Sequence, residues 1–199
     1  MAEITASRVK ELREKSGAGM MDCKKALAEA NGDMEEALVL LRKKGVATAQ
    51  KKSSRVTKEG LIEAYIHAGG KIGVLVEVGV ETDFVSRGDD FRTFCHELAM
   101  QVAAASPRWV YRDEVPEDII ATERAIYAEQ VQGKPENVVD KIVTGKLEKF
   151  FQENCLMDQA YVREPSMSIE QLRTDLVGKI GENVEVRRFV RFQLGEAQA

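Results

Sequence analysis

The histidines and cysteines of this chain are the residues whose side chains most often carry covalent chemistry. Nucleophilic catalysis needs a serine or cysteine beside a base, and Cys95 does adjoin His96. Both fall in a segment with helical periodicity, where neighbours point about 100° apart, so they are not a ready nucleophile and base. His67 falls at the end of a predicted strand, without a serine, cysteine and acid set beside it. We therefore expect a protein that is not an enzyme.

Metal and nucleotide sites also lack their usual spacings. No H-x-x-x-H or H-E-x-x-H pair exists, and Cys23, Cys95 and Cys155 lie far apart with no C-x-x-C pair. Residues 68–73 (AGGKIG) lie between two predicted strands, and residues 16–25 precede a helix but lack the G-x-x-x-x-G-K-[ST] pattern. We therefore expect no metal site, no disulfide framework and no cofactor of the protein's own.

Two short segments are better suited to contact with another protein. Thr82-Asp83-Phe84-Val85 directly follows a long valine-rich strand and precedes a helix. An aromatic side chain beside an acid at the tip of a strand suits insertion into a partner, although a core position at a strand end is the usual fate of phenylalanine. The other segment is a glycine loop, residues 17–19, that leads into two methionines. Adjacent methionines cannot both face one helical core, so one is expected to be exposed unless both fill gaps in a thin bundle.

Composition is that of a soluble protein rich in helix. Of the 199 residues, 44% are apolar and 31% charged, and no apolar run approaches the roughly 18 residues of a membrane span. The segment 1–7 lacks the pattern of a secretion signal, so we expect a cytoplasmic protein. Residues 1–55 carry 12 Lys or Arg against 8 Asp or Glu, whereas the whole chain has a net charge of −4. This asymmetry favours two units with different surfaces over a chain devoted to polyanions.

The N-terminal 45 residues predict three short helices. Thr5 can cap the first, which Gly17 ends; Gly32 ends the second, and Asp33 caps the third with a capping-box spacing. The apolar stripes of so small a bundle predict a thin core.

A basic, polar segment follows at residues 42–60 and predicts a linker, with some helix at its start as an open alternative. We accordingly divide the chain into residues 1–55, the three-helix module with its linker, and residues 56–199, the core domain. The linker's lysines and arginines could touch phosphates, but no aromatic residue interrupts them to stack bases, so we expect no direct nucleic-acid binding.

The remainder predicts an α+β core, in which a small antiparallel sheet is packed by helices. Apolar residues alternate over 62–66 and again over 74–80, and a hairpin turn of three or five residues would place both sets on one face. Helical patterns and their capping residues predict helices over 89–105, 117–132, from 135 through 151, and 168–180, and a final strand over 184–194. The second and third of these helices would form a helical hairpin.

With these residues identified, the chain resembles the bacterial elongation factor Ts family, in its short form. The stretch VKELREKSGAGMMDCKKALAEANGD is similar to the family's opening signature, and EAYIHAGGKIGVLVEVGVETDFVSR to its most diagnostic one. EVPEDII, GKPENVVDKIVTGKLEKFF and GENVEVRRFVRF follow in the family's order. The resemblance extends over essentially the whole chain. Its departures are mild, such as Ser16 where threonine is common and Ser86 where alanine is common.

The resemblance implies a translation elongation factor that exchanges guanine nucleotides on elongation factor Tu. Its N-terminal module would be similar to ubiquitin-associated domains and would dock on the partner through Gly19, Met20, Met21 and Lys24. The element Thr82, Asp83, Phe84 and Val85 would enter near the partner's Mg²⁺, where the phenylalanine wedges between two helices and dislodges the ion, so that GDP is released. GDP, GTP and Mg²⁺ would belong to the partner. Short members of the family tend to dimerise, so a homodimer is also expected.

Two other functions fit parts of the chain. A ubiquitin-type adaptor would act through residues 1–45 alone. A nucleic-acid or ribosome-associated protein would act through the basic residues of 42–58, with a steep dependence on salt.

Overall fold

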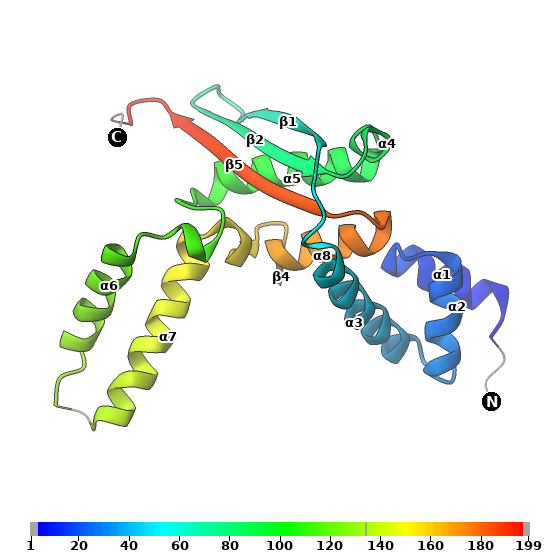
Figure 1. The fold of residues 1–199 in the computed structure, drawn as a ribbon, viewed down its shortest axis with the longest axis horizontal. Coiled ribbons are helices and arrows are strands. Elements are labelled where there is room, and N and C mark those ends of the chain that lie inside the picture. Colours follow the sequence, from blue (N-terminus) through cyan, green and yellow to red (C-terminus); the bar gives the residue numbers. More distant parts are fainter. Residues whose placement is uncertain (1–3, 134, 197–199) are drawn as a thin grey trace. The chain divides into compact units, whose positions relative to one another are not determined.

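The computed structural model describes residues 4–133 and 135–196, and it confirms the α+β class with helices and a small sheet (Figure 1). The chain forms two compact units whose segments alternate along the sequence. The first contains Met1–Leu61, Gly79–Phe94 and Arg173–Glu185, and the second contains Ile62–Val78, Cys95–Leu172 and Val186–Ala199. The functional division at residue 55 stays a prediction.

The N-terminal module consists of α1 (Ala6–Ser16), α2 (Met20–Glu29) and α3 (Met34–Lys52). The predicted N-caps of α1 and α3 and the predicted end of α1 are confirmed. The Thr5 side chain accepts a hydrogen bond from the backbone N–H of Arg8, and Oδ1 of Asp33 accepts one from Glu36 at 2.8 Å. Gly17 ends α1 in the left-handed conformation, φ 66°, which costs a glycine little.

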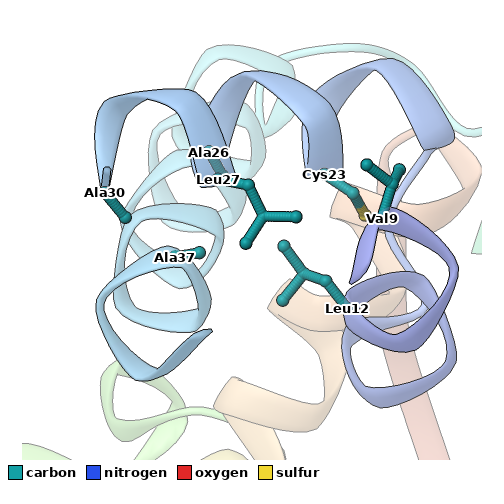
Figure 2. Packing of buried hydrophobic residues seen from close by; sticks show 7 residues of the cluster. All are labelled: Val9, Leu12, Cys23, Ala26, Leu27, Ala30 and Ala37. Carbon is teal, nitrogen blue, oxygen red and sulfur yellow. The ribbon is translucent and has the colours of Figure 1, made fainter. Parts of the chain in front are cut away.

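The core of this module is built from small side chains. Figure 2 shows Leu12 of α1 and Leu27 of α2 pointing toward one another, and both are fully buried. The other buried members have side chains smaller than leucine: Val9, Cys23, Ala26, Ala30 and Ala37. Partly buried side chains, among them Met34, Leu38 and Leu41, pack against this cluster, and the two leucines are its largest fully buried members, as expected for a bundle of this size.

The helix that is an open alternative at the start of the predicted linker, residues 42–60, is longer than expected. Helix α3 continues through Lys52, and Ala49 near its end is buried. Tertiary contact explains the difference, because Gly45 of α3 lies close to α8 (Ile169–Ile180): a Cβ built on Gly178 would lie 3.4 Å from the Cα of Gly45. Packing of this kind stabilises a helix whose own sequence shows no sustained apolar period.

The sheet has three strands in the order β1–β2–β5, with β1 at Glu59–Ile66, β2 at Ile72–Val80 and β5 at Val184–Gln193. The predicted three- or five-residue hairpin turn, with both apolar sets on one face, is wrong. The N–H of His67 donates to the carbonyl of Ile72, which pairs odd with even positions across the turn. The valines of β2 are consequently buried, whereas Ile62 and Ile66 are exposed on the opposite face.

Alternation along β5 also breaks. Val184 and Val186 are buried as expected, but Val190 and Phe192 are exposed. Arg187 and Arg188 both donate hydrogen bonds to Glu77 of β2. Because two consecutive residues of β5 contact one residue of β2, the even-numbered positions of β5 face the core before this point and solvent after it.

Helix α5 (Asp89–Ala105) buries the predicted face, consisting of Phe91, Phe94, Cys95, Leu98 and Val102. Helices α6 (Glu117–Glu129) and α7 (Glu136–Asn154) lie side by side as the predicted hairpin (Figure 1), around buried Val131, Val143 and Leu147. Its connection includes Lys134, which lies outside the described residues. Arg112, in the short 3-10 helix η1 (Arg112–Glu114), donates to both Glu148 and Asp158 in the second unit.

The sequence did not predict a two-stranded ribbon, β3 (Ala160–Tyr161) and β4 (Glu164–Ser168), or the 3-10 helix η2 (Leu156–Asp158). The ribbon ends at the predicted capping box of α8. The N–H of Ser168 donates to Oε1 of Gln171 at 3.0 Å, and the N–H of Gln171 donates to Oγ of Ser168 at 3.2 Å. This reciprocal pair satisfies two donors that the helix cannot satisfy itself.

Candidate functional site

The segment Thr82–Val85 forms a separate turn of helix rather than a plain strand end. Helix α4 spans Asp83–Ser86, and Thr82 is its N-cap, with the side chain accepting from the N–H of Val85 at 3.5 Å. The hydroxyl of Ser86 donates a hydrogen bond to the carbonyl of Asp83 at 2.9 Å, and this bond closes the turn. Ser86 is buried, so the turn has an inner side made by this residue and an outer side made by its first residues.

The phenyl ring of Phe84 lies on the outer side. Phe84 is 84% exposed, the highest value among the large apolar side chains that the structure describes. The alternative of a core phenylalanine at a strand end is therefore wrong. Exposing a whole phenyl ring forfeits about 1.5–3 kcal/mol of burial, so this position is better explained by a partner's surface than by the chain's own stability.

An ion pair joins the first residue of α4 to the residue that follows the helix. Asp83 Oδ2 lies 2.8 Å from Nη2 of Arg87, one helical turn further on, and both side chains are mostly exposed. A Cβ at Gly88 would come within 3.2 Å of the Val85 carbonyl, so glycine allows the chain to leave α4 closely and enter α5.

A carboxylate distant in the sequence holds the first residue of this turn. Glu182, in the loop between α8 and β5, accepts the backbone N–H of Thr82 at 3.0 Å and the hydroxyl of Thr82 at 2.7 Å. Glu182 lies in the stretch GENVEVRRFVRF, whose residues carried no predicted role in the site. Contact between residues 100 positions apart leaves no local sequence pattern.

The second predicted site is the glycine loop of the module. Gly19 is the N-cap of α2, and Met20 and Met21 are the first residues of the helix. Both methionines are exposed, Met21 at 65%, so the alternative in which both fill the module's core is wrong. Lys24 is exposed one turn further on. These residues thus present two flexible apolar side chains and a cation at the start of one helix.

Buried groups fix the loop beneath those methionines. The Ser16 hydroxyl donates to the Leu12 carbonyl at 2.7 Å and accepts the N–H of Ala18 at 3.2 Å. Cys23 is buried and lies 3.7 Å from the same hydroxyl. The loop is therefore held by α1 and α2 and does not depend on a ligand for its conformation.

The remaining candidate residues are placed elsewhere. Nδ1 of His96 lies 2.9 Å from Glu63, and Nδ1 of His67 lies 3.0 Å from the hydroxyl of Tyr65, both in the second unit. Cys95 faces the interior, where burial raises its pKa to about 12. A thiol with such a pKa is a poor nucleophile at neutral pH, so Cys95 and His96 do not form a catalytic pair.

The three cysteines are free and buried: Cys23, Cys95 and Cys155. Among the residues that the structure describes, no helix combines the length and apolar character that a membrane span needs.

Comparison with known proteins decides the family. The sequence model of the family Elongation factor TS matches residues 1–196. The chain belongs to the elongation factor Ts family. The elongation factor Ts of Carboxydothermus hydrogenoformans is 56% identical over 198 residues, covering 98% of this chain and 91% of its relative. That of Fervidobacterium nodosum is 57% identical over 196 residues, covering 98% and 100%. That of Anaeromyxobacter sp. is 59% identical over 198 residues, covering 98% and 90%.

Family membership confirms the resemblance drawn from the signatures. The family is one of translation elongation factors that serve nucleotide exchange on elongation factor Tu, and it is not one of enzymes in the usual sense. The two predicted sites belong to the first compact unit, since Gly19–Lys24 and Thr82–Val85 both fall within it.

Proposed function

We propose that this chain binds elongation factor Tu·GDP, displaces the partner's Mg²⁺ and so promotes GDP release, after which GTP binds. The observation that carries this proposal is the exposed ring of Phe84, held at the start of a capped turn and flanked by Asp83. Aromatic side chains in this position act as interface anchors, and truncation of such an anchor often costs about 2 kcal/mol or more.

The energetics of exchange follow from linkage. A protein that weakens GDP binding must itself be bound more weakly by the GDP form than by the nucleotide-free form. Mg²⁺ is often the largest local charge at a phosphate site, and its displacement removes much of the diphosphate's stabilisation. A rigid apolar wedge can exert this effect without any reacting group. The chain accordingly uses no cofactor, because the nucleotide and the metal are bound by the partner.

In this proposal the N-terminal module supplies affinity. Met20 and Met21 are exposed at the start of α2, directly after a loop that the module fixes from within, and Lys24 adds a positive charge one turn away. Methionine adapts to a partner's surface at low cost because its side chain is unbranched and polarizable. The complex forms in the cytoplasm, without membrane or direct nucleic-acid contact.

Stopped-flow release of fluorescent GDP from elongation factor Tu tests the proposal. Phe84→Ala is expected to lower the release rate at saturating exchange factor by at least about tenfold, while circular dichroism shows an unchanged fold, since the ring is not part of the core. Val56→Ala removes another exposed apolar side chain of the first unit and serves as the control. Equal release rates for Phe84→Ala and wild type would refute the wedge.

The same assay separates the two other functions. An adaptor that acts through its N-terminal helices would bind its partner with residues 1–45 alone and would tolerate Phe84→Ala. A nucleic-acid-binding protein would lose function when Lys43 and Lys51 are neutralised and would show a steep salt dependence. Exchange through the wedge predicts neither result.

We also propose a homodimer through the exposed face of the sheet. Ile66 at 68% and Phe192 at 63% are exposed there, and Leu75 shares the face. Glu77 lies two residues after Leu75 and therefore on the same face of the sheet. Its carboxylate accepts a hydrogen bond from Arg188, which lies four residues before Phe192 and so on the same side of β5. Such an apolar face with an ionic cluster suits a self-complementary twofold interface.

Sedimentation equilibrium tests this assembly. The wild-type chain is expected to sediment as a dimer at micromolar concentration, and Phe192→Asp with Ile66→Asp as a monomer. A monomeric wild type would refute the interface and would leave the wedge mechanism untouched.

A further inference from the structure

Helix α4 is too short to hold its own orientation. It has four residues, Asp83–Ser86, whereas isolated helices need about 12–15 residues to be even marginally stable. Its largest side chain, Phe84, is exposed and contributes little to anchoring the turn. The direction of the ring must therefore be set by contacts at the base of the turn.

Glu182 provides the strongest of these contacts. Its Oε2 accepts the backbone N–H of Thr82 at 3.0 Å, and its Oε1 accepts the Thr82 hydroxyl at 2.7 Å. Hydrogen bonds to a carboxylate are stronger than those between neutral groups. Because the hydroxyl proton is directed to Glu182, an oxygen lone pair of Thr82 is left for the N–H of Val85, which is the capping bond of α4.

The loop that carries Glu182 is itself fixed on both sides. Gly181 ends α8 with φ 73°, and the ammonium of Lys52 donates to its carbonyl. On the other side, the side-chain amide of Asn183 donates to the carbonyls of Ser53 and Arg55. All of these residues belong to the first compact unit, so the carboxylate is attached to the end of α3 as well as to α8.

We propose that Glu182 is a positioning residue for nucleotide exchange, which acts by locking the Thr82 cap and thereby the direction of the Phe84 ring. This inference rests on the proposed function of that ring. Glu182 does not need to touch nucleotide or metal. Its carboxylate resists rotation of α4 when the ring is pressed between structural elements of the partner. Loss of the carboxylate lowers the rate of the step that follows docking and leaves docking itself unchanged.

Two kinetic quantities distinguish this role from a general effect on stability. Release of fluorescent GDP from elongation factor Tu is measured at increasing concentrations of Glu182→Ala and of wild type. The saturating release rate is expected to fall by about tenfold or more, the effect of losing hydrogen bonds to a charged group. The half-saturating concentration is expected to change less than about twofold, because Met20 and Met21 are untouched.

Matched variants complete the test. Glu182→Gln keeps one acceptor for the N–H of Thr82 and is expected to restore part of the rate; it also serves should the alanine variant fold poorly. Glu148→Ala removes a carboxylate contact of Arg112 in the second unit and is expected to leave the rate unchanged. Thr82→Val combined with Glu182→Ala should slow release by less than the product of the two single effects, since both changes break the bond between the Thr82 hydroxyl and Glu182.

A saturating rate for Glu182→Ala equal to that of wild type, or fully additive losses in the double variant, would overturn the positioning role. An increase confined to the half-saturating concentration would overturn it as well. Failure of the wedge mechanism is recognised separately, because GDP would then also leave elongation factor Tu at the wild-type rate in the presence of Phe84→Ala.

Discussion

Asn183 donates its backbone N–H to Oε1 of Glu81 at 2.7 Å, although 102 residues separate the two. This bond joins the loop after α8 to the residue directly before the Thr82 cap. The Asn183 N–H lowers the pKa of Glu81 below its ordinary value of about 4.5, and a hydrogen bond from Arg55 acts in the same direction. The base of the candidate wedge therefore contains a carboxylate that is stabilised in its charged form.

This pKa shift predicts an acid-dependent contribution to stability. A carboxyl whose pKa is lowered on folding stabilises the native state fully above its unfolded pKa and loses that effect as the pH falls through the folded pKa. The free energy of unfolding of wild type should exceed that of Glu81→Gln most at neutral pH, with the difference shrinking below about pH 4.5. Urea denaturation of both variants from about pH 7 to pH 3 measures the difference. A difference that does not change with pH contradicts the assignment.

The module core predicts an unequal response to truncation. Leu27→Ala removes one of the two facing leucines that are the largest fully buried side chains of the module and should destabilise the module by about 2–5 kcal/mol. Thermal unfolding followed by circular dichroism measures this loss. Met21→Ala, at a position 65% exposed in the same helix, is the control and should change stability by less than about 0.5 kcal/mol. Similar losses for the two variants are incompatible with the packing described.

The capping box of α8 can be tested in isolation from the wedge. Ser168→Ala removes the oxygen that accepts the N–H of Gln171 and should lower the free energy of unfolding by about 0.5–2 kcal/mol. Ser166→Ala deletes an equal hydroxyl, which donates to the carboxylate of Glu164, two residues earlier, at an exposed position, and should be close to neutral. Urea denaturation measures the free energy of unfolding of both variants. Equal losses for the two would show that the capping hydrogen bond does not stabilise α8.

The cysteines should be unreactive in the native protein. Burial raises the pKa of Cys95 to about 12 and that of Cys155 to about 11, so little thiolate exists at pH near 8. Labelling of both thiols by an aromatic disulfide reagent should be slower in buffer than in urea by more than about a hundredfold. Mass spectrometry of the labelled peptides identifies each site. Rapid native labelling of Cys95 would mean that the interior opens more readily than its burial indicates.

The elements with strong local signals could be predicted from the sequence. Caps such as Thr5, Asp33 and Ser168 act on neighbours three residues away, and the helical hairpin follows from apolar periodicity and a glycine–proline break. The end of α3 could not be predicted. Its last turns have no apolar period, and close packing between Gly45 and Gly178 stabilises them.

Sheet register was the second failure, and its reason is geometric. Alternation shows that Ile62 and Ile66 share a face, but it does not show which face, because a change of one residue in the turn reverses the choice. The bond between His67 and Ile72 makes that choice in the folded chain. Those isoleucines consequently belong to the surface that we assign to a dimer.

By itself the sequence determined the class of the fold, the family and the identity of both candidate sites, because these depend on residue types and on spacings that lie within short stretches. Only the tertiary structure decided that the Phe84 ring is exposed, that Phe84 lies in a separate turn of helix and that Glu182 holds that turn. The physical reason is distance along the chain. A hydrogen bond between residues 100 positions apart depends on how helices and strands pack against one another, and no short sequence pattern predicts that packing.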